Sequence, residues 1–135
     1  MPELPEVEVV RRGLDRRVAG RTIVDVAVTG ARSIRRHPDA GSFVVAVRDR
    51  TITGVDRRGK YLLLRLDDGA VLVAHLRMSG QLLVEADPAI ARVKHTHVVM
   101  TLDDHAELRF VDPRTFGELF VSTDVDPSGA VGELS

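Results

Sequence analysis

The sequence lacks cysteine and has no long hydrophobic run. Without cysteine there are no disulfides, no thiolate zinc sites and no cysteine nucleophile, which agrees with an expected cytoplasmic location. No apolar stretch approaches the roughly 20 residues that a membrane-spanning helix needs. The opening MPELPE also lacks the basic and apolar regions of a signal peptide. We therefore expect a soluble protein with no membrane partner.

The 135 residues are 44% hydrophobic and 29% charged, as in a normal globular protein. This length predicts one domain, over residues 1–122. Residues 123–135 are rich in Asp, Pro, Gly and Ser and have the composition of a linker.

Charge is unevenly distributed along the chain, although the net charge is only −1. Residues 1–60 carry 13 basic and 8 acidic side chains, whereas residues 61–135 carry 6 and 12. Arginine outnumbers lysine 17 to 2. Arginine suits phosphate recognition, but GC-rich coding gives the same bias, and a solvated face is the commoner explanation of such a patch. Charge alone therefore does not establish a nucleic-acid partner.

Residues 4–19 are predicted to form a helix, with Pro5 near its start and Gly20 after its end. Its apolar residues recur at helical spacing: Val7, Val10, Leu14 and Val18.

The rest of the chain reads as short strands separated by turn residues. Residues 42–49 are ambiguous, because Ser42 could cap a short helix and the apolar run could equally be a strand. One helix followed by about eight strands is typical of a mainly β sandwich or barrel with flanking helices. The predicted strands are 22–29, 51–56, 60–66, 71–76, 81–85, 97–102, 107–111 and 118–122.

The N-terminus carries a possible catalytic group. Removal of Met1 would leave Pro2 with a free secondary amine, followed directly by Glu3, with Glu6 one turn later. Such an amine can attack a sugar carbon and give an iminium, which acts as an electron sink for elimination. A neighbouring carboxylic acid can supply the protons. The alternative is that this segment is only a well-formed helix start. If Met1 is retained, Pro2 is an amide and cannot react.

Five segments, in order, resemble the formamidopyrimidine-DNA glycosylase family. They are MPELPEVEVVRRGL at 1–14, RRGKYLL at 57–63, HLRMSG at 75–80, KHTHV at 94–98 and DPRTFG at 112–117. The resemblance implies an α+β fold that is mainly β: an antiparallel two-sheet β-sandwich whose N-terminal helix carries the nucleophile. It implies base-excision repair of oxidised purines (8-oxoguanine and formamidopyrimidines) by a glycosylase and AP lyase, through an iminium and β,δ-elimination.

The resemblance also assigns catalytic roles. Pro2 matches the nucleophile, Glu3 the acid that assists ring opening, and Glu6 a supporting carboxylate. Lys60 matches a lysine on a strand after a β-turn that contacts the phosphate beside the lesion. Without the resemblance, Lys60 would be an ordinary exposed lysine.

A second group of residues is expected to bind DNA. A glycosylase flips its target nucleotide out of the duplex, and Met78, Arg114 and Phe116 match the residues that fill the resulting void. Their positions beside Ser-Gly and in a Pro-Arg-Thr-Phe-Gly loop suggest exposed tips rather than core residues. Lys94 and His95 match contacts to the DNA backbone.

The remaining histidines give no metal site. His95 and His97 are separated by one residue, so on a strand both rings would lie on the same face, as two metal ligands might. No third ligand is evident. His75 and His97 are instead expected to be partly buried and structural.

Full members of the family continue into a helix–two-turn–helix region and a zinc finger, which this sequence does not contain. We therefore expect no cofactor in this chain, a monomer, and damaged double-stranded DNA and the parent's own C-terminal domain as partners. The sequence is expected to be a fragment or a truncated relative with little or no excision activity. The alternative is a non-catalytic module, derived from this family, that binds DNA or a protein partner.

Overall fold

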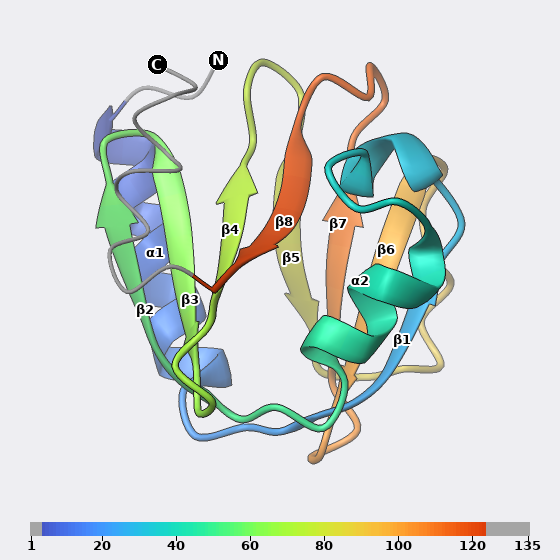
Figure 1. Ribbon diagram of the computed structural model, residues 1–135. Coiled ribbons are helices and arrows are strands. Elements are labelled where there is room, and N and C mark those ends of the chain that lie inside the picture. Colours follow the sequence, from blue (N-terminus) through green and yellow to red (C-terminus); the bar gives the residue numbers. More distant parts are fainter. Residues whose placement is uncertain (1–3, 124–135) are drawn as a thin grey trace.

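The computed structural model describes residues 4–123 and contains two four-stranded antiparallel sheets packed face to face (Figure 1). One sheet has the strand order β2-β3-β4-β8 and the other β1-β6-β7-β5. The sandwich prediction is confirmed. The first sheet consists of β2 (Ile52–Arg58), β3 (Tyr61–Leu66), β4 (Val71–His75) and β8 (Glu118–Ser122), and the second of β1 (Ile23–Val28), β6 (Thr96–Leu102), β7 (Glu107–Val111) and β5 (Gln81–Glu85).

Helical segments cover the two open sides of the sandwich. Helix α1 (Leu4–Val18) packs on the side formed by β2 and β5, and α2 (Ala40–Val47) packs with the 3-10 helix η1 (Ala31–Ile34) against β1 and β8. The apolar stripe of α1 enters the same core as the buried side chains of α2. None of the helices in the described part is long and apolar enough to cross a membrane.

Side chains from α1 and from the loop between η1 and α2 also satisfy backbone groups on the outer strands of the first sheet. On β2, the carbonyl of Val55 accepts a hydrogen bond from Arg11 (3.0 Å), and its N–H donates to Asp15 (2.9 Å). On β8, the N–H of Val121 donates to Nε2 of His37 (3.1 Å). Unpaired peptide groups at a sheet edge would otherwise need water or another strand.

Three details differ from the sequence-based expectations. The ambiguous segment 42–49 lies largely in a helix, which begins earlier because Asp39, rather than Ser42, caps it by accepting from the N–H of Ser42. The prediction that Lys60 lies on a strand is wrong by one residue, because Gly59 (φ 58°) and Lys60 form the turn that precedes β3. The 3-10 helix was not anticipated.

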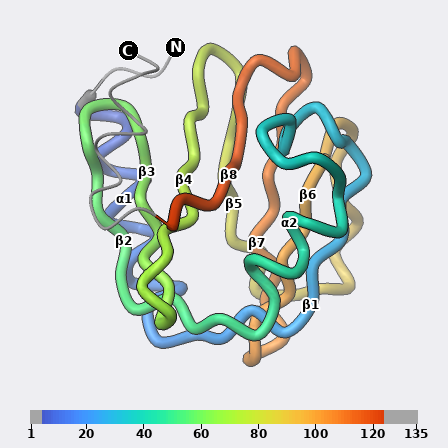
Figure 2. The backbone as a smooth tube through the Cα atoms, viewed as in Figure 1, coloured from blue at the N-terminus to red at the C-terminus, as the bar shows by residue number. Residues whose placement is uncertain are grey.

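The registers of the two sheets bring distant loops to one end of the molecule. In the first sheet Tyr61 pairs with His75, and His75 pairs with Glu118. In the second, Val111 pairs with both Gln81 and Thr96. The segments beside these residues therefore share one end of the sandwich, at the top of Figure 2, where α1 also begins. These are the motif segments 57–63, 75–80, 94–98 and 112–117.

Candidate active site and nucleic-acid interface

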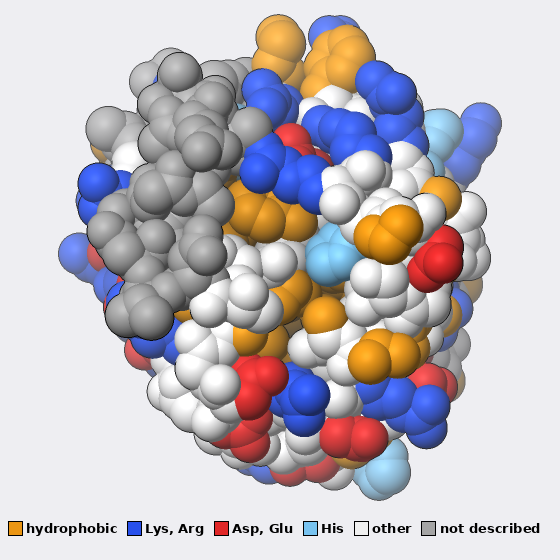
Figure 3. Space-filling model, in the orientation of Figure 1, with side chains coloured by type: hydrophobic (Ala, Val, Ile, Leu, Met, Phe, Trp, Pro, Cys, Tyr) orange, Lys and Arg blue, Asp and Glu red, His pale blue; other side chains and the backbone are white. Residues whose placement is uncertain are grey.

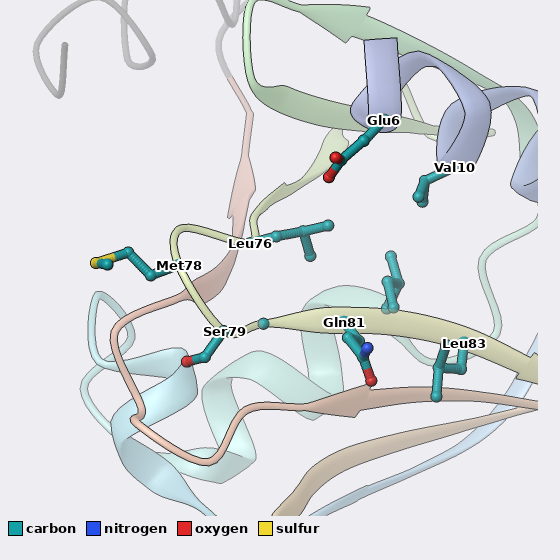
Figure 4. A pocket seen from close by; sticks show the side chains of 9 residues that line it. Glu6, Val10, Leu76, Met78, Ser79, Gln81 and Leu83 are labelled. Carbon is teal, nitrogen blue, oxygen red and sulfur yellow. The ribbon is translucent and has the colours of Figure 1, made fainter. Parts of the chain in front are cut away.

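Glu6 and Met78, expected to act on the same substrate, line the same pocket. This pocket, of about 440 Å³, lies between the first turns of α1 and the start of β5. Figure 4 shows Glu6 and Val10 of α1 facing Leu76 and β5 across it, while Met78 extends away toward solvent. Met78 is 60% exposed. The prediction that it is an exposed tip is confirmed.

The β4–β5 loop that carries Met78 is a tight turn. The N–H of Gly80 donates to the carbonyl of Leu76 at 2.8 Å. A Cβ at position 80 would lie only 2.5 Å from that carbonyl oxygen, so glycine is required there. Arg77 adopts a positive φ of 52°, and its N–H donates to Nδ1 of His75. The turn therefore presents Met78 with little backbone freedom.

The β7–β8 loop is organised by Asp112, whose side chain is buried. Its carboxylate accepts hydrogen bonds from the N–H of Gly117 (2.7 Å), the N–H of Arg114 (3.2 Å) and the hydroxyl of Ser79. Because Ser79 belongs to the β4–β5 loop, Asp112 fixes the loops of Met78 and Arg114 relative to one another.

Phe116, at the tip of the β7–β8 loop, is held by its backbone and is 44% exposed. The guanidinium of Arg35, next to η1, donates to the carbonyls of Phe116 and Gly117, both at 2.9 Å. A Cβ at Gly117 would lie 2.7 Å from the backbone oxygen of His75. Phe116 is therefore an exposed apolar tip, as predicted. Hydrogen bonds to Arg35 and to Asp112 hold its loop in place. The side chain of Arg114 is also exposed.

Lys60 and His75 lie at the same end of the first sheet. His75 is buried (4% exposed), and its ring meets Tyr61 edge-on with centroids 4.4 Å apart. Burial, followed by the charge of Arg77, lowers the pKa of His75 to about 4. The positive charge of Lys60 acts in the same direction. His75 is therefore neutral at physiological pH, and its burial is more complete than expected.

Lys94 and His95 end the long β5–β6 loop. Lys94 is exposed, and His95, with a positive φ of 68°, accepts the N–H of Asp112 on its carbonyl at 3.0 Å. His97, within β6, contacts the carbonyl of Asp112 through Nε2 at 2.9 Å. Asp112 thus connects three of the predicted DNA-binding segments. A buried Arg109 supports this loop from β7 by donating to the carbonyl of Ile90 at 2.7 Å.

Pro2 and Glu3 lie outside the described residues. The helix that follows them is firmly anchored, because Glu8 accepts hydrogen bonds from Arg11 and from Arg57 of β2. The guanidinium of Arg11, and then those of Arg57 and Arg12, lower the pKa of Glu8 to about 2. The start of α1 is thus tied to the first sheet by a carboxylate that stays ionised.

Two parts of this region were missed by sequence reasoning. Asp112 stood in a recognised motif, but its three hydrogen bonds come from residues up to 33 positions away and leave no local pattern. The buried carboxylate of Glu118 and the arginines around it were also missed. These residues lie just after η1, in the β4–β5 loop and on β8, and their spacing has no periodicity. Within residues 4–123 no group of three His, Asp or Glu side chains could hold a metal ion.

Comparison with known proteins agrees with this geometry. The family model of the formamidopyrimidine-DNA glycosylase N-terminal domain matches residues 1–119. The formamidopyrimidine-DNA glycosylase of Nocardia farcinica is 54% identical, over 87% of this chain and 43% of its own length. That of Thermobifida fusca is 50% identical, over 98% of this chain and 47% of its own length. The chain thus spans less than half the length of these curated relatives.

Solved structures agree as well. The Lactococcus lactis enzyme in complex with DNA containing an abasic site superposes with a TM-score of 0.88 at 31% identity, covering 98% of this chain and 47% of that one. The same enzyme, inhibited and bound to DNA containing N7-benzyl-Fapy-dG, also gives 0.88, at 32% identity. With the two-sheet fold and the gathered motif loops, these matches show that the chain belongs to the formamidopyrimidine-DNA glycosylase family, as its N-terminal domain.

Proposed function

We propose that this chain supplies the catalytic half of a DNA glycosylase and AP lyase that removes oxidised purines such as 8-oxoguanine and formamidopyrimidines. The observation that carries the proposal is the convergence at one end of the sandwich. Glu6, at the head of the helix that Pro2 precedes, shares a pocket with Met78, and Met78 shares a second pocket with Phe116. The nucleophile and the void-filling residues would thus serve one DNA site.

The proposed chemistry uses the amine of Pro2 after removal of Met1. The amine attacks C1′ of the damaged nucleotide, and the base leaves with the electron pair of the glycosidic bond and takes up a proton. The C1′–O4′ bond then breaks to give an iminium, and Glu3 protonates O4′. Loss of a C2′ proton to a base expels the 3′ phosphate, and a second elimination expels the 5′ phosphate. Glu6 would orient these groups from the next turn of the helix.

The exposed tips provide the means of nucleotide flipping. Extruding a nucleotide leaves a void, and apolar wedges commonly fill such spaces. Met78 is flexible and apolar, Phe116 can insert between bases, and Arg114 can hydrogen-bond the orphaned base. Lys60, Lys94 and His95, at the same end, would contact backbone phosphates.

The proposal includes the setting of this activity. Damaged double-stranded DNA in the bacterial cytoplasm is the partner, together with the C-terminal part found in longer relatives, and the chain acts as a monomer. We propose no cofactor for the chain itself, since the reaction above uses an amine and carboxylates. The structural zinc of full-length family members would belong to a finger beyond this span.

Borohydride trapping tests the proposal. The chain, with Met1 removed and verified by intact mass, is mixed with duplex DNA containing an abasic site and reduced with borohydride. We expect a covalent adduct that peptide mapping assigns to Pro2. A chain carrying an N-terminal extension is the matched control, because its Pro2 nitrogen is an amide, and it should give no adduct.

The other outcomes are equally informative. An adduct mapped to Lys60 would overturn the proposed nucleophile. DNA binding without any adduct would favour the alternative of a non-catalytic DNA-binding module.

A further inference from the structure

A buried carboxylate beside the two apolar tips is surrounded by more positive charge than it can neutralise. The side chain of Glu118, only 4% exposed, pairs with Arg36 at 2.5 Å, with Arg35 at 3.2 Å and with Arg77 at 3.7 Å. One carboxylate faces three guanidinium groups, so the cluster keeps a net positive charge. Figure 3 shows basic side chains gathered at the upper end of the molecule, where hydrophobic side chains also protrude.

These arginines line a pocket. It has a volume of about 340 Å³, and it is lined by three arginines, Arg32, Arg35 and Arg77, together with Met78 and Phe116. The guanidinium of Arg35 already donates hydrogen bonds to the backbone carbonyls of Phe116 and Gly117. The other two cations can still donate: within residues 4–123 the guanidinium of Arg32 has no hydrogen bond or ion pair, and that of Arg77, whose side chain is 37% exposed, makes a long ion pair with Glu118 at 3.7 Å.

We infer that this pocket binds a backbone phosphate of the DNA, close to the nucleotide that is flipped out. The inference rests on the proposed function. Met78 and Phe116 would enter the base stack, so the sugar–phosphate backbone must pass beside them, where the pocket opens. Guanidinium groups match phosphate oxygens in geometry and charge. Arg32 and Arg77 would donate to the phosphate, and Arg35 and Arg36 would hold Glu118 and the loop in place.

The carboxylate of Glu118 would hold Arg77 in position for the phosphate. Arg77 is 37% exposed and points back to Glu118. A buried acid of this kind holds a long side chain in one orientation, so less conformational entropy is lost when the phosphate binds. The phosphate contact anchors the backbone while the two tips separate the bases.

Variants of the two arginines with free donors provide the test. Arg32→Ala and Arg77→Gln are compared with wild type and with Arg17→Ala, an exposed arginine near the far end of α1. Binding is measured at low salt to a duplex containing an uncleavable abasic-site analogue, with one phosphate at a time replaced by a neutral methylphosphonate. Thermal melting checks folding, and within residues 4–123 Arg32→Ala removes no side-chain hydrogen bond or ion pair.

Wild type should lose affinity when one particular phosphate near the lesion is neutralised. Arg32→Ala should bind unmodified DNA roughly tenfold more weakly and be less sensitive than wild type to neutralisation at that position, because only Arg77 would still contact the phosphate. Its slope of log K against log salt should fall by about 0.9. Arg77→Gln should behave like Arg32→Ala, and Arg17→Ala should bind like wild type.

Two results would overturn the inference. One is that Arg32→Ala and Arg77→Gln bind like Arg17→Ala. The other is that neutralising each phosphate affects the variants as much as wild type, which would show general attraction rather than a site. If wild type binds DNA but gives no borohydride adduct, the proposed function fails and the phosphate site is still tested. If wild type binds no duplex at all, both fail.

Discussion

At the scale of single residues, burial determines the charge of His75. Its ring lies under the loop of Met78, accepts the N–H of Arg77 and contacts Tyr61. A histidine buried in this way resists protonation, because the charged form would lose its hydration. The site end of the molecule therefore depends on an uncharged imidazole for its packing.

The stability of the chain should fall as the pH is lowered from about 6.5 toward 4. The unfolded state binds a proton at the ordinary pKa of 6.5, whereas folded His75 does so only near 4. The unfolded state thus binds more protons in this window, and about 3 kcal/mol is lost across it. Urea unfolding at several pH values measures this slope. Burial lowers the pKa of His37 as well, which adds a pH dependence of the same sign.

A substitution separates the contribution of His75. His75→Gln should unfold more easily at pH 7 but lose most of the slope between pH 6.5 and 4. His105→Gln, in the exposed β6–β7 turn, should keep the wild-type profile. An unchanged slope in His75→Gln would contradict this account.

Asp112 offers a second test at this scale. Asp112→Asn places an amide N–H₂ where the carboxylate now accepts from buried donors, and it leaves the N–H of Gly117 or the hydroxyl of Ser79 unsatisfied. An unsatisfied buried donor costs about 1–3 kcal/mol. Urea unfolding should show this loss for Asp112→Asn. Ser79→Ala, which removes one donor but leaves the carboxylate other partners, should cost less. Equal effects would argue against a shared role of Asp112 in both loops.

At the scale of elements, helix α1 was readable from the sequence because its apolar residues recur at helical spacing. Three of the four predicted stripe residues are buried, and Val10 is partly buried against the core. The strands were readable for a similar reason, since turn residues mark their ends. The α2 segment was ambiguous because eight residues are too few to distinguish the helical spacing of apolar residues from that of a strand.

The stripe of α1 can be tested directly. Leu14→Ala should lower the free energy of unfolding by about 3 kcal/mol, because Leu14 is 3% exposed and truncation leaves a cavity in the core. Val9→Ala is the matched control on the same helix. Val9 is 69% exposed, so its change should be within about 0.5 kcal/mol. Denaturant unfolding measures both, and similar losses would mean that the helix packs differently.

The site was only partly predictable. Exposed tips such as Met78 and Phe116 follow from local turn residues, but the contacts that orient them do not. Arg35 reaches the backbone of Phe116 across 81 positions, and His37 reaches Val121 across 84. Such contacts depend on the strand order and register of the sheets. No local pattern in the sequence indicates them before the fold is known. The family resemblance assigned roles to residues in these loops, but it gave none to Asp112 and did not include Glu118, which hold the loops in place.

At the scale of the whole molecule, the chain presents one end of a complete sandwich but spans less than half the length of its relatives. Because the net charge of the chain is only −1, the proposed binding to DNA would depend on local clusters of basic side chains. We expect the chain to trap on preformed abasic sites while excising 8-oxoguanine at least 100-fold more slowly than a full-length relative. Single-turnover excision and borohydride trapping on matched duplexes measure the two activities. Comparable excision by the two proteins would contradict this prediction.

The hydrogen bonds that Arg11, Asp15 and His37 make with the outer strands have a further consequence. An open sheet edge is a template on which a second chain can add a strand, and this is a common start of aggregation. Here the peptide groups of Val55 and Val121 are already bonded to side chains of the same molecule. Helix α1, which carries Glu6, therefore also covers the β2 edge of the sheet, and a substitution that loosened it would promote self-association as well as displace Glu6.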